Sequence, residues 1–484
     1  MSDHQDPARE RLLDASLSEV LGRPAVSSPE LELSLPASPA PTRNNGWLAA
    51  ALVLLGSAVV IGSWASSRPD EQVAAGTGDG PVQDDPVQDS PAQDDQGRGK
   101  PFPRLWPLNP SFSFPELPLT VCKTIEELEQ LPGDIVNLSV ELSSLKDLER
   151  LARFSSLCRL HLRGNGPDTF WAGVGDEAGV LDPLQKLQSL QILWLPSNIV
   201  LAPSHVRALR PIRSLRSLSI GSSKRLTAEV ARELVALPSL RQLTVHGALL
   251  PASFLAELKA GQLEALELLA CPNLDVPEFA AIAKIKSLQS LAVMMAGKGR
   301  STIEGKRYEL FELGEDAFKA FRALPKLVAL DLAESQFDDK FMAELPKQLH
   351  YLRLGDYRMT PATIADLKRL QGLEELRFNH ATKYEDLVDL LESLRLKRLW
   401  LRGWLNDDVV RALARHRTLE SATLRIHGAR DNHGAKDLSL LTTAPRLRSL
   451  TLRYGRQYDV TNLPPAAVMK AFKDRGIDVT LQPF

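Results

Sequence analysis

Apolar residues recur along most of this chain in one short pattern, Leu-x-x-Leu-x-Leu, in which another apolar residue sometimes replaces a leucine. Most successive copies begin 22 to 25 residues apart, so the pattern is an internal repeat. Apolar and polar positions alternate within each copy, which predicts a short strand with one face in a core. The twelve clear copies span residues 157–162, 190–195, 215–220, 240–245, 263–268, 288–293, 327–332, 349–354, 373–378, 396–401, 419–424 and 447–452.

Two further segments, 135–140 and 477–481, fit as a first copy and a closing strand. The stretches between copies carry apolar residues at helical spacing, for example 226–237, 251–260 and 407–416. Several of them start next to Thr, Pro or Asp, as helices tend to do. One strand and one helix per repeat predict an α/β solenoid, in which the apolar positions of all repeats form one continuous core.

This pattern resembles the leucine-rich repeat family, of the bacterial membrane-anchored type, over about three quarters of the chain. The resemblance implies a horseshoe with parallel β-strands on the concave face and helices on the convex face. It also implies an asparagine three positions after the last core leucine, which is present as Asn165 and Asn198. Other residues replace it elsewhere, so we expect an incomplete ladder of side-chain bonds to the backbone; they are Ser223, Ala248, Cys271, Ala296 and Ser335.

Three insertions interrupt the repeat, at about residues 164–183, 296–315 and 427–440. Insertions in a solenoid map to loops at one edge, where functional residues are often located. Many insertions, however, have no function and are merely tolerated by the fold.

The N-terminal part has a different composition. Residues 44–67 carry no charge, and a helix from Trp47 to Ala65 would span about 28 Å, close to the hydrocarbon thickness of a bilayer. Tryptophans near both ends of this run suit the membrane interfaces. We predict a transmembrane helix at 44–67 and membrane attachment through 47–65. A signal peptide cleaved after Ala65 remains the alternative.

Flanking charges predict the orientation. Arg23 and Arg43 precede the span, whereas only Arg68 follows closely, so the tail 1–43 is expected in the cytoplasm. Within this tail, residues 6–22 are expected to form a short amphipathic helix. Residues 68–105 form a Pro/Asp/Gln-rich linker, which we expect to be disordered. The repeat domain, 106–484, is then expected on the extracytoplasmic, periplasmic side.

Composition limits the choice of ligand. The formal net charge is −2, so the chain as a whole has no attraction to nucleic acid, and we expect no nucleic-acid partner. The three cysteines, Cys122, Cys158 and Cys271, fit no Cys-x-x-Cys metal spacing. Buried thiols are expected, with a Cys122–Cys158 disulfide as the alternative.

Catalytic motifs give little indication of an enzyme. Residues 296–302 lack the spacing of a phosphate-binding loop, and neither a nucleophile elbow nor a His-Glu-x-x-His motif occurs. We therefore expect no catalysis, cofactor or metal. The insertion at 427–440 keeps a metal-dependent enzyme open as an alternative, because it contains four metal-ligand types in a spacing of no known site: His427, Asp431, His433 and Asp437.

The outward strand positions are the best candidates for binding. On the N-terminal strands they are mixed in character, and include Arg159, His161, Arg163, Trp194, Thr244, His246 and Glu267. From Lys347 onward the chain holds 24 Lys+Arg against 16 Asp+Glu, an excess of +8. Outward positions in this region form the predicted binding face: Tyr351, Arg353, Arg377, Asn379, Arg398, Trp400, Arg402, Arg425 and Arg453.

Two interpretations of this arginine and aromatic strip remain open. It is a binding face for an acidic partner, since Arg and Trp dominate binding energy at interfaces, or its arginines pair with nearby carboxylates such as Glu375. We expect a membrane-anchored, non-catalytic binding module for a protein or envelope ligand. The alternative is a structural scaffold of the envelope or of a complex, without a discrete ligand.

Overall fold

The computed structural model describes residues 119–483 except 165–170, 172–173, 176, 197–198, 222–225, 295–299, 304–305, 310–311, 334, 356–357, 379, 382–383, 403–404, 426–436 and 455–463. The chain divides into two units, Met1–Asp95 and Gln96–Phe484, and all described residues belong to the second. The predicted transmembrane helix, the short helix at 6–22 and the linker lie outside the described residues. Among the described helices, none is long and apolar enough to cross a membrane.

One parallel sheet of 15 strands runs through the described unit, and its strands follow one another in chain order. Its strands are β1 (Thr120–Cys122), β2 (Asn137–Glu141), β3 (Arg159–Arg163), β4 (Ile192–Trp194), β5 (Ser217–Gly221), β6 (Gln242–His246), β7 (Ala265–Leu269), β8 (Ser290–Met294), β11 (Ala329–Leu332), β12 (Tyr351–Leu354), β14 (Glu375–Phe378), β16 (Arg398–Leu401), β17 (Ser421–Arg425), β18 (Ser449–Tyr454) and β19 (Asp478–Pro483).

Each of the twelve clear sequence copies forms one of these strands, and the two weaker copies form β2 and β19. The sequence pattern missed β1, which has only three residues and precedes the first copy. Alternation cannot be recognised in so short a segment. The prediction of parallel strands in one sheet is confirmed.

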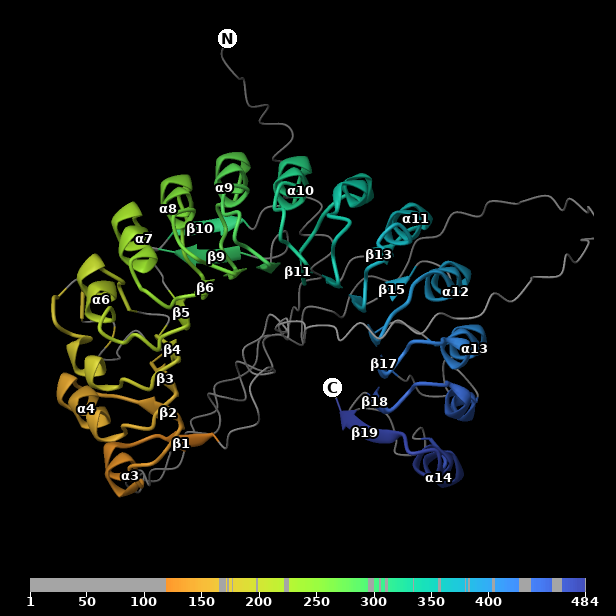
Figure 1. The fold of residues 1–484 in the computed structure, drawn as a ribbon, viewed down its shortest axis with the longest axis horizontal. Coiled ribbons are helices and arrows are strands. Elements are labelled where there is room, and N and C mark those ends of the chain that lie inside the picture. Colours follow the sequence, from red (N-terminus) through yellow and green to blue (C-terminus); the bar gives the residue numbers. More distant parts are fainter. Residues whose placement is uncertain are drawn as a thin grey trace, which may run out of the picture. The chain divides into compact units, whose positions relative to one another are not determined.

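Helices connect the strands and lie on the outer side of the curved sheet, whereas the strands line its inner, concave side (Figure 1). Two successive strands can pair in parallel only if the chain crosses back to the starting edge of the sheet between them, and the helix of each repeat makes this connection. The α-helices are α3 (Ile125–Gln130), α4 (Leu145–Arg150), α6 (Pro203–Ala208), α7 (Ala228–Val235), α8 (Ala252–Leu258), α9 (Val276–Ile282), α10 (Glu315–Arg322), α11 (Pro361–Leu367), α12 (Tyr384–Ser393), α13 (Asp407–Arg415) and α14 (Ala466–Asp474).

Four repeats use a 3₁₀ segment in this outer layer, and these segments are η3 (Leu151–Arg153), η4 (Asp182–Lys186), η5 (Asp339–Glu344) and η6 (Leu438–Thr443). Together the sheet and its outer layer form an α/β architecture consistent with a repeat solenoid.

Leucines of equal register fill the space between the sheet and the helices. Leu352 pairs with Leu376 across β12 and β14, and Leu376 pairs with Leu399 in β16. All three side chains are almost completely buried. Burying one such side chain contributes about 1.5–3 kcal/mol, and its repetition in successive strands makes the core continuous.

Helix starts follow the expected residue types. The side chain of Thr227 accepts the backbone N–H of Val230 at the start of α7. Asn406 accepts the N–H of Val409 at 2.9 Å at the start of α13. These caps satisfy backbone donors that the first helical turn leaves unpaired. The capping residues in the sequence therefore specify where each helix begins.

Three residues after the last core leucine, where asparagine is expected, other residues occupy the chain. Two of them still contact a backbone carbonyl of the preceding repeat. Ser335, which is buried, donates through Oγ to the carbonyl of Val293 in β8 at 2.7 Å. The Cys271 thiol lies 3.7 Å from the carbonyl of Val245 in β6. Ala248 has no side-chain donor. At these described positions a hydroxyl and a thiol replace the amide and one donor is missing, as expected; Asn165, Asn198, Ser223 and Ala296 lie outside the described residues.

The insertions add structure that the repeat pattern did not predict. Trp171, from the first insertion, is completely buried in the core. The second insertion contains a hairpin of β9 (Arg300–Ile303) and β10 (Lys306–Glu309), which pair antiparallel. A small parallel pair also forms from β13 (Arg358–Met359) and β15 (His380–Ala381).

The three cysteines are free thiols. Cys122 and Cys271 are buried, whereas Cys158 is partly exposed. The alternative of a Cys122–Cys158 disulfide is therefore not realised in this structure.

Candidate functional site on the concave strand face

Strand side chains that do not enter the core form aligned rows across the concave face. In β16, Arg398 and Trp400 alternate with the buried Leu399 and Leu401. Neighbouring parallel strands lie about 4.8 Å apart, so residues of equal register are close enough to interact. The predicted binding residues lie in β12, β14, β16, β17 and β18 or directly after β16, except Asn379, which is outside the described residues.

Three of the predicted arginines pair with carboxylates of the same face. Arg353 Nη1 lies 3.3 Å from Oδ2 of Asp331, and Arg377 Nη2 lies 2.6 Å from Oε1 of Glu375. Arg398 pairs with the second oxygen of Glu375. Both carboxylates are buried. In this part of the face, the arrangement is that of the second interpretation, in which arginines are paired within the sheet.

Tyr351 lies beside these ion pairs and is buried. It packs in a cluster with Ala329 on the neighbouring β11 and Ala292 on β8, the next strand along, and Met294 contacts the same cluster. The guanidinium carbon of Arg377 lies 5.4 Å from the centre of the Tyr351 ring, a cation–π distance. Tyr351 therefore orders its neighbours, and little of its ring is available to a ligand.

Glu267 in β7 is a buried acid of the face. It is 2% exposed, and it accepts hydrogen bonds from Gln242 Nε2 at 3.1 Å and Thr244 Oγ1 at 2.9 Å. Burial raises the pKa of Glu267 to about 8, and the nearby Asp331 carboxylate adds to the increase. A buried carboxyl group without a cationic partner prefers its neutral form. Glu267 is therefore largely protonated at neutral pH.

Burial also raises the pKa of Asp331, while Arg353 and the backbone N–H of Ala333 act in the opposite direction. The Ala333 N–H donates to Asp331 Oδ1 at 2.9 Å. Ala292 occupies the strand between Glu267 and Asp331 and has no side chain long enough to separate them. The two acids therefore interact electrostatically across one strand.

At the C-terminal end of the face, three arginines occupy neighbouring strands. Arg425 and Arg453 are register partners in β17 and β18. Arg402 directly follows Leu401, whose register partner is Leu424, so it continues the same row on β16. All three are half-buried. We call Arg402, Arg425 and Arg453 the arginine row.

Trp400 lies next to this row. The guanidinium carbon of Arg453 is 6.0 Å from the centre of the Trp400 ring. Burial lowers the pKa of Arg453, and the positive charge of Arg402 lowers it further. The two guanidinium groups therefore repel each other.

The N-terminal strands carry a mixed group, as predicted. The His161 and Trp194 rings lie 5.9 Å apart, and Arg163 Nε donates to Ser139 Oγ at 2.7 Å. Burial lowers the pKa of His161, and the Arg163 charge lowers it further. His161 is therefore neutral at pH 7, and this end of the face has no dominant charge.

Of the four potential metal ligands in the insertion at 427–440, the structure describes only Asp437. Its carboxylate accepts the backbone N–H of Ser439 at 2.9 Å, as a cap of η6. Among the described residues, no group of three or more His, Cys, Asp and Glu side chains is placed to hold a metal ion.

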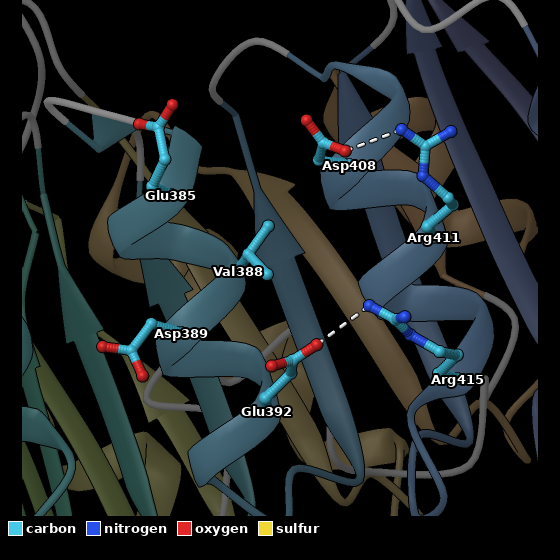
Figure 2. Close-up of a pocket in the computed structure, with 7 residues that line it drawn as sticks. All are labelled: Glu385, Val388, Asp389, Glu392, Asp408, Arg411 and Arg415. Atoms are coloured by element: carbon cyan, nitrogen blue, oxygen red, sulfur yellow. Dashed lines mark hydrogen bonds and ion pairs between the residues drawn. The ribbon is translucent and has the colours of Figure 1, made fainter. Parts of the chain in front are cut away.

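A groove of about 270 Å³ lies on the opposite, helical side, between α12 and α13 (Figure 2). Val388 lines it, and its charged residues largely pair with one another. Arg411 lies 2.6 Å from Asp408, and Arg415 lies 2.9 Å from Glu392. Both pairs are exposed; the first lies within α13, and the second links α13 to α12. We assign the groove to packing between these two helices.

Comparison of the sequence with protein families and with curated proteins finds no match. Arguments about function therefore depend on the geometry of the concave face.

Sequence reasoning did not single out Asp331, which binds Arg353. The sequence pattern could have identified Asp331, because this residue occupies an outward position of the copy at 327–332. The burial of Asp331 and Glu267 had no such signal, since it depends on the side chains of neighbouring strands.

Proposed function

We propose that this chain is a leucine-rich-repeat protein, anchored in a membrane by residues 44–67, that binds a protein partner through its concave face without catalysis. The observation that carries the proposal is the continuous parallel sheet, which aligns the outward side chains of 15 strands on one surface. Such a surface suits a partner of extended shape, because each repeat adds a further row of contacts.

The mechanism would be binding to a preorganised surface. Strand positions are fixed by the buried leucines, and several concave side chains are already held by ion pairs, such as Arg377 by Glu375. A partner that docks here would order few further side chains, which lowers the entropic cost of association. The partner is proposed to be acidic, because the described outward positions of β16–β18 carry arginines and no carboxylate.

We further propose a cytoplasmic N-terminus and a repeat domain on the periplasmic side, from the arginines that flank the apolar segment. Protease added to spheroplasts, in which the outer membrane has been opened, should then digest the repeat domain. Protection of the domain, with cleavage limited to the N-terminal tail, would reverse this orientation.

A structural scaffold without a discrete ligand is the second candidate. The observation in its favour is that Arg353, Arg377 and Arg398 already have carboxylate partners within the sheet. Arginines used in this way stabilise the array itself and offer less to a ligand.

Site-specific photo-crosslinking in intact cells separates the two candidates. A photoreactive phenylalanine analogue at Trp194 or Trp400 would place the probe on the concave face, with an aromatic side chain in place of another. We expect one discrete crosslinked protein from these positions.

The matched control positions are Lys319 in α10 and Arg415 in α13, which are exposed on the helical side. Binding through the concave face predicts no discrete product there. Equal products from both sides, or products from the helical side alone, would refute concave-face binding and favour a scaffold.

A further inference from the structure

The described sheet ends at β19, and no other described strand pairs with the outer edge of this strand (Figure 1). β19 has six residues, and all six have register partners on its inner neighbour, β18. At the opposite end of the sheet, β1 has only three residues. An exposed sheet edge is a template for further pairing, and a very short edge strand is one way to prevent it. The edge of β19 lacks this protection.

The outer edge of β19 presents the backbone groups of Val479 and Leu481. The N–H of Asp478 donates to the carbonyl of Arg448 at 2.9 Å, so the backbone of Asp478 faces β18. Successive residues of a strand direct their backbone groups to opposite edges. Thr480 therefore also faces β18, whereas Val479 and Leu481 each direct one N–H and one C=O away from it.

The residues on either side limit how far this edge can pair. Pro483, within β19, has no N–H to donate. The N–H of Ile477 is already bound to the carbonyl of Phe472 at 2.9 Å. Proline in a sheet is confined to positions such as edge strands, where its missing N–H would face away from the ladder. Within residues 477–483, a full exchange of outward hydrogen bonds is therefore restricted to Val479 and Leu481.

The side chains of the same two residues leave apolar surface at this end of the core. Val479 and Leu481 pack against the core but are only partly buried. Their register partners in β18, Leu450 and Leu452, are completely buried. A further strand beyond β19 would cover Val479 and Leu481 as β19 covers β18, which is favourable because apolar surface leaves water.

We propose that β19 pairs antiparallel with β19 of a second copy of this chain, around a two-fold axis at Thr480. In this register, Val479 of each copy lies opposite Leu481 of the other, and each such pair exchanges both of its N–H···O bonds. Sliding one strand by two residues would place Val479 opposite Pro483, or Leu481 opposite Ile477. Either shift leaves outward backbone groups without a partner, so the register at Thr480 uses this edge most completely.

The side chains on the concave side also suit the two-fold axis. Thr480 lies opposite Thr480 of the second copy, and such threonine pairs are favourable across antiparallel strands. The only charged residue of β19, Asp478, lies opposite Gln482 of the second copy, so the two carboxylates are not opposed. An isologous contact repeats each favourable pair twice. This self-complementarity favours a second copy over an unrelated strand, and the concave faces of both copies become continuous.

Cysteine crosslinking of the purified full-length chain in detergent tests the proposal, in a Cys158→Ser background because the other two cysteines are buried. Directly opposed residues at the Thr480 position have Cα atoms about 4.5 Å apart, within the range of a disulfide. Thr480→Cys should therefore give a disulfide-linked dimer on mild oxidation. Thr451→Cys is the matched control, because Thr451 is the register partner of Thr480 on β18. Its two copies would be three strand spacings apart, about 14 Å, and should not crosslink.

A mixed pair of variants tests the register. Asp478→Cys mixed with Gln482→Cys should give a crosslinked dimer. Each alone should give little, because the same residue of both copies would be offset by four positions, about 13 Å. Equal crosslinking of Thr480→Cys and Thr451→Cys would overturn the proposal. Crosslinking of Thr480→Cys to Val121→Cys in β1, instead of to itself, would show head-to-tail assembly and overturn it as well.

Sedimentation velocity measures the association without a crosslink. The dimer fraction of the original chain should rise with concentration. Thr480→Lys places like charges opposite each other and should raise the dissociation constant of the dimer roughly fivefold, whereas Thr451→Lys should change it less than about twofold. Mixing Thr480→Lys with Thr480→Glu should restore association, and circular dichroism checks that each variant is folded.

The outcomes that overturn the proposal are specific. An original chain that stays monomeric at all concentrations, without a crosslink from Thr480→Cys, excludes the dimer. Equal weakening by Thr480→Lys and Thr451→Lys would assign association to net charge, and would exclude pairing at β19. A different protein crosslinked to Thr480→Cys in place of a second copy would assign the edge to that partner. The proposed binding function is tested separately, by photo-crosslinking from Trp194 in β4.

Discussion

Glu267→Gln tests whether the concave face contains a carboxyl group that folding keeps protonated. The side chain is 2% exposed, and its pKa is raised to about 8 from an ordinary value of 4.5. Glutamine has the shape of the protonated form and never ionises. Its amide nitrogen can donate to the hydroxyl of Thr244, which can rotate to accept, while its oxygen keeps the bond from Gln242.

The direction of the pH effect follows from the raised pKa. Folding favours the protonated form, so the contribution of Glu267 is complete below about pH 4.5 and is lost as the pH rises through about 8. One pKa unit corresponds to about 1.36 kcal/mol. Between pH 6 and pH 8 the original chain should therefore lose roughly 2 kcal/mol of local stability, whereas Glu267→Gln should lose none of it.

The thiol of Cys271 provides a local assay. It follows β7 by two residues, and burial raises its pKa to about 12, so it reacts only when this part of the sheet opens. The labelling rate of Cys271, measured by peptide mass spectrometry, is compared between the original chain and the variant at each pH. The rate in the original chain is divided by the rate in the variant, so that intrinsic thiol reactivity cancels. This ratio should rise roughly 50-fold from pH 6 to pH 8.

Glu264→Gln is the matched control, because Glu264 lies in the same repeat with its side chain 53% exposed. The ratio of Cys271 labelling rates between the original chain and Glu264→Gln should not change with pH. Cys122, in β1, serves as an internal reference far along the sheet. A ratio for Glu267→Gln that stays constant from pH 6 to pH 8 would refute the assignment of a neutral Glu267.

Three other substitutions test the packing and the ion pairs by urea unfolding. Glu375→Gln removes the carboxylate that holds Arg377 and Arg398 and should cost about 1–3 kcal/mol. Glu374→Gln, at the more exposed pair with Lys397, should cost less than about 1 kcal/mol. A small effect of Glu375→Gln would mean that its arginines are satisfied otherwise. Trp171→Ala should cost about 3–5 kcal/mol, because the completely buried indole leaves a cavity; a neutral result would show that the first insertion does not support the core. Thr227→Ala removes the cap of α7 and should cost about 0.5–2 kcal/mol, with Thr227→Ser close to the original; equal losses in both would exclude capping as the cause.

Much of the architecture follows from local sequence rules. The leucine pattern located β3 and the strands of the later repeats. Both the alternation with a period of two and the repeat length of 22 to 25 residues can be recognised directly in the sequence. Thr227 and Asn406 cap helices at the positions where the pattern changes from strand to helix. The strand β1 and the hairpin of β9 and β10 escaped prediction, since each lies outside the repeat and is short.

The sequence by itself determined which residues face the core and which face outward, because that depends on alternation within a strand. It also placed Arg398, Trp400 and Arg402 on the exposed side of one strand. Tertiary structure alone decided which outward residues meet. The register of parallel strands brings Glu375 to Arg398 and aligns Arg425 with Arg453, although 23 and 28 residues separate them in the chain. The same register buries Glu267, because its surroundings come from neighbouring strands. The Arg398–Glu375 pair, the burial of Glu267 and the alignment of Arg425 with Arg453 are therefore properties of contacts between repeats, which no single repeat encodes.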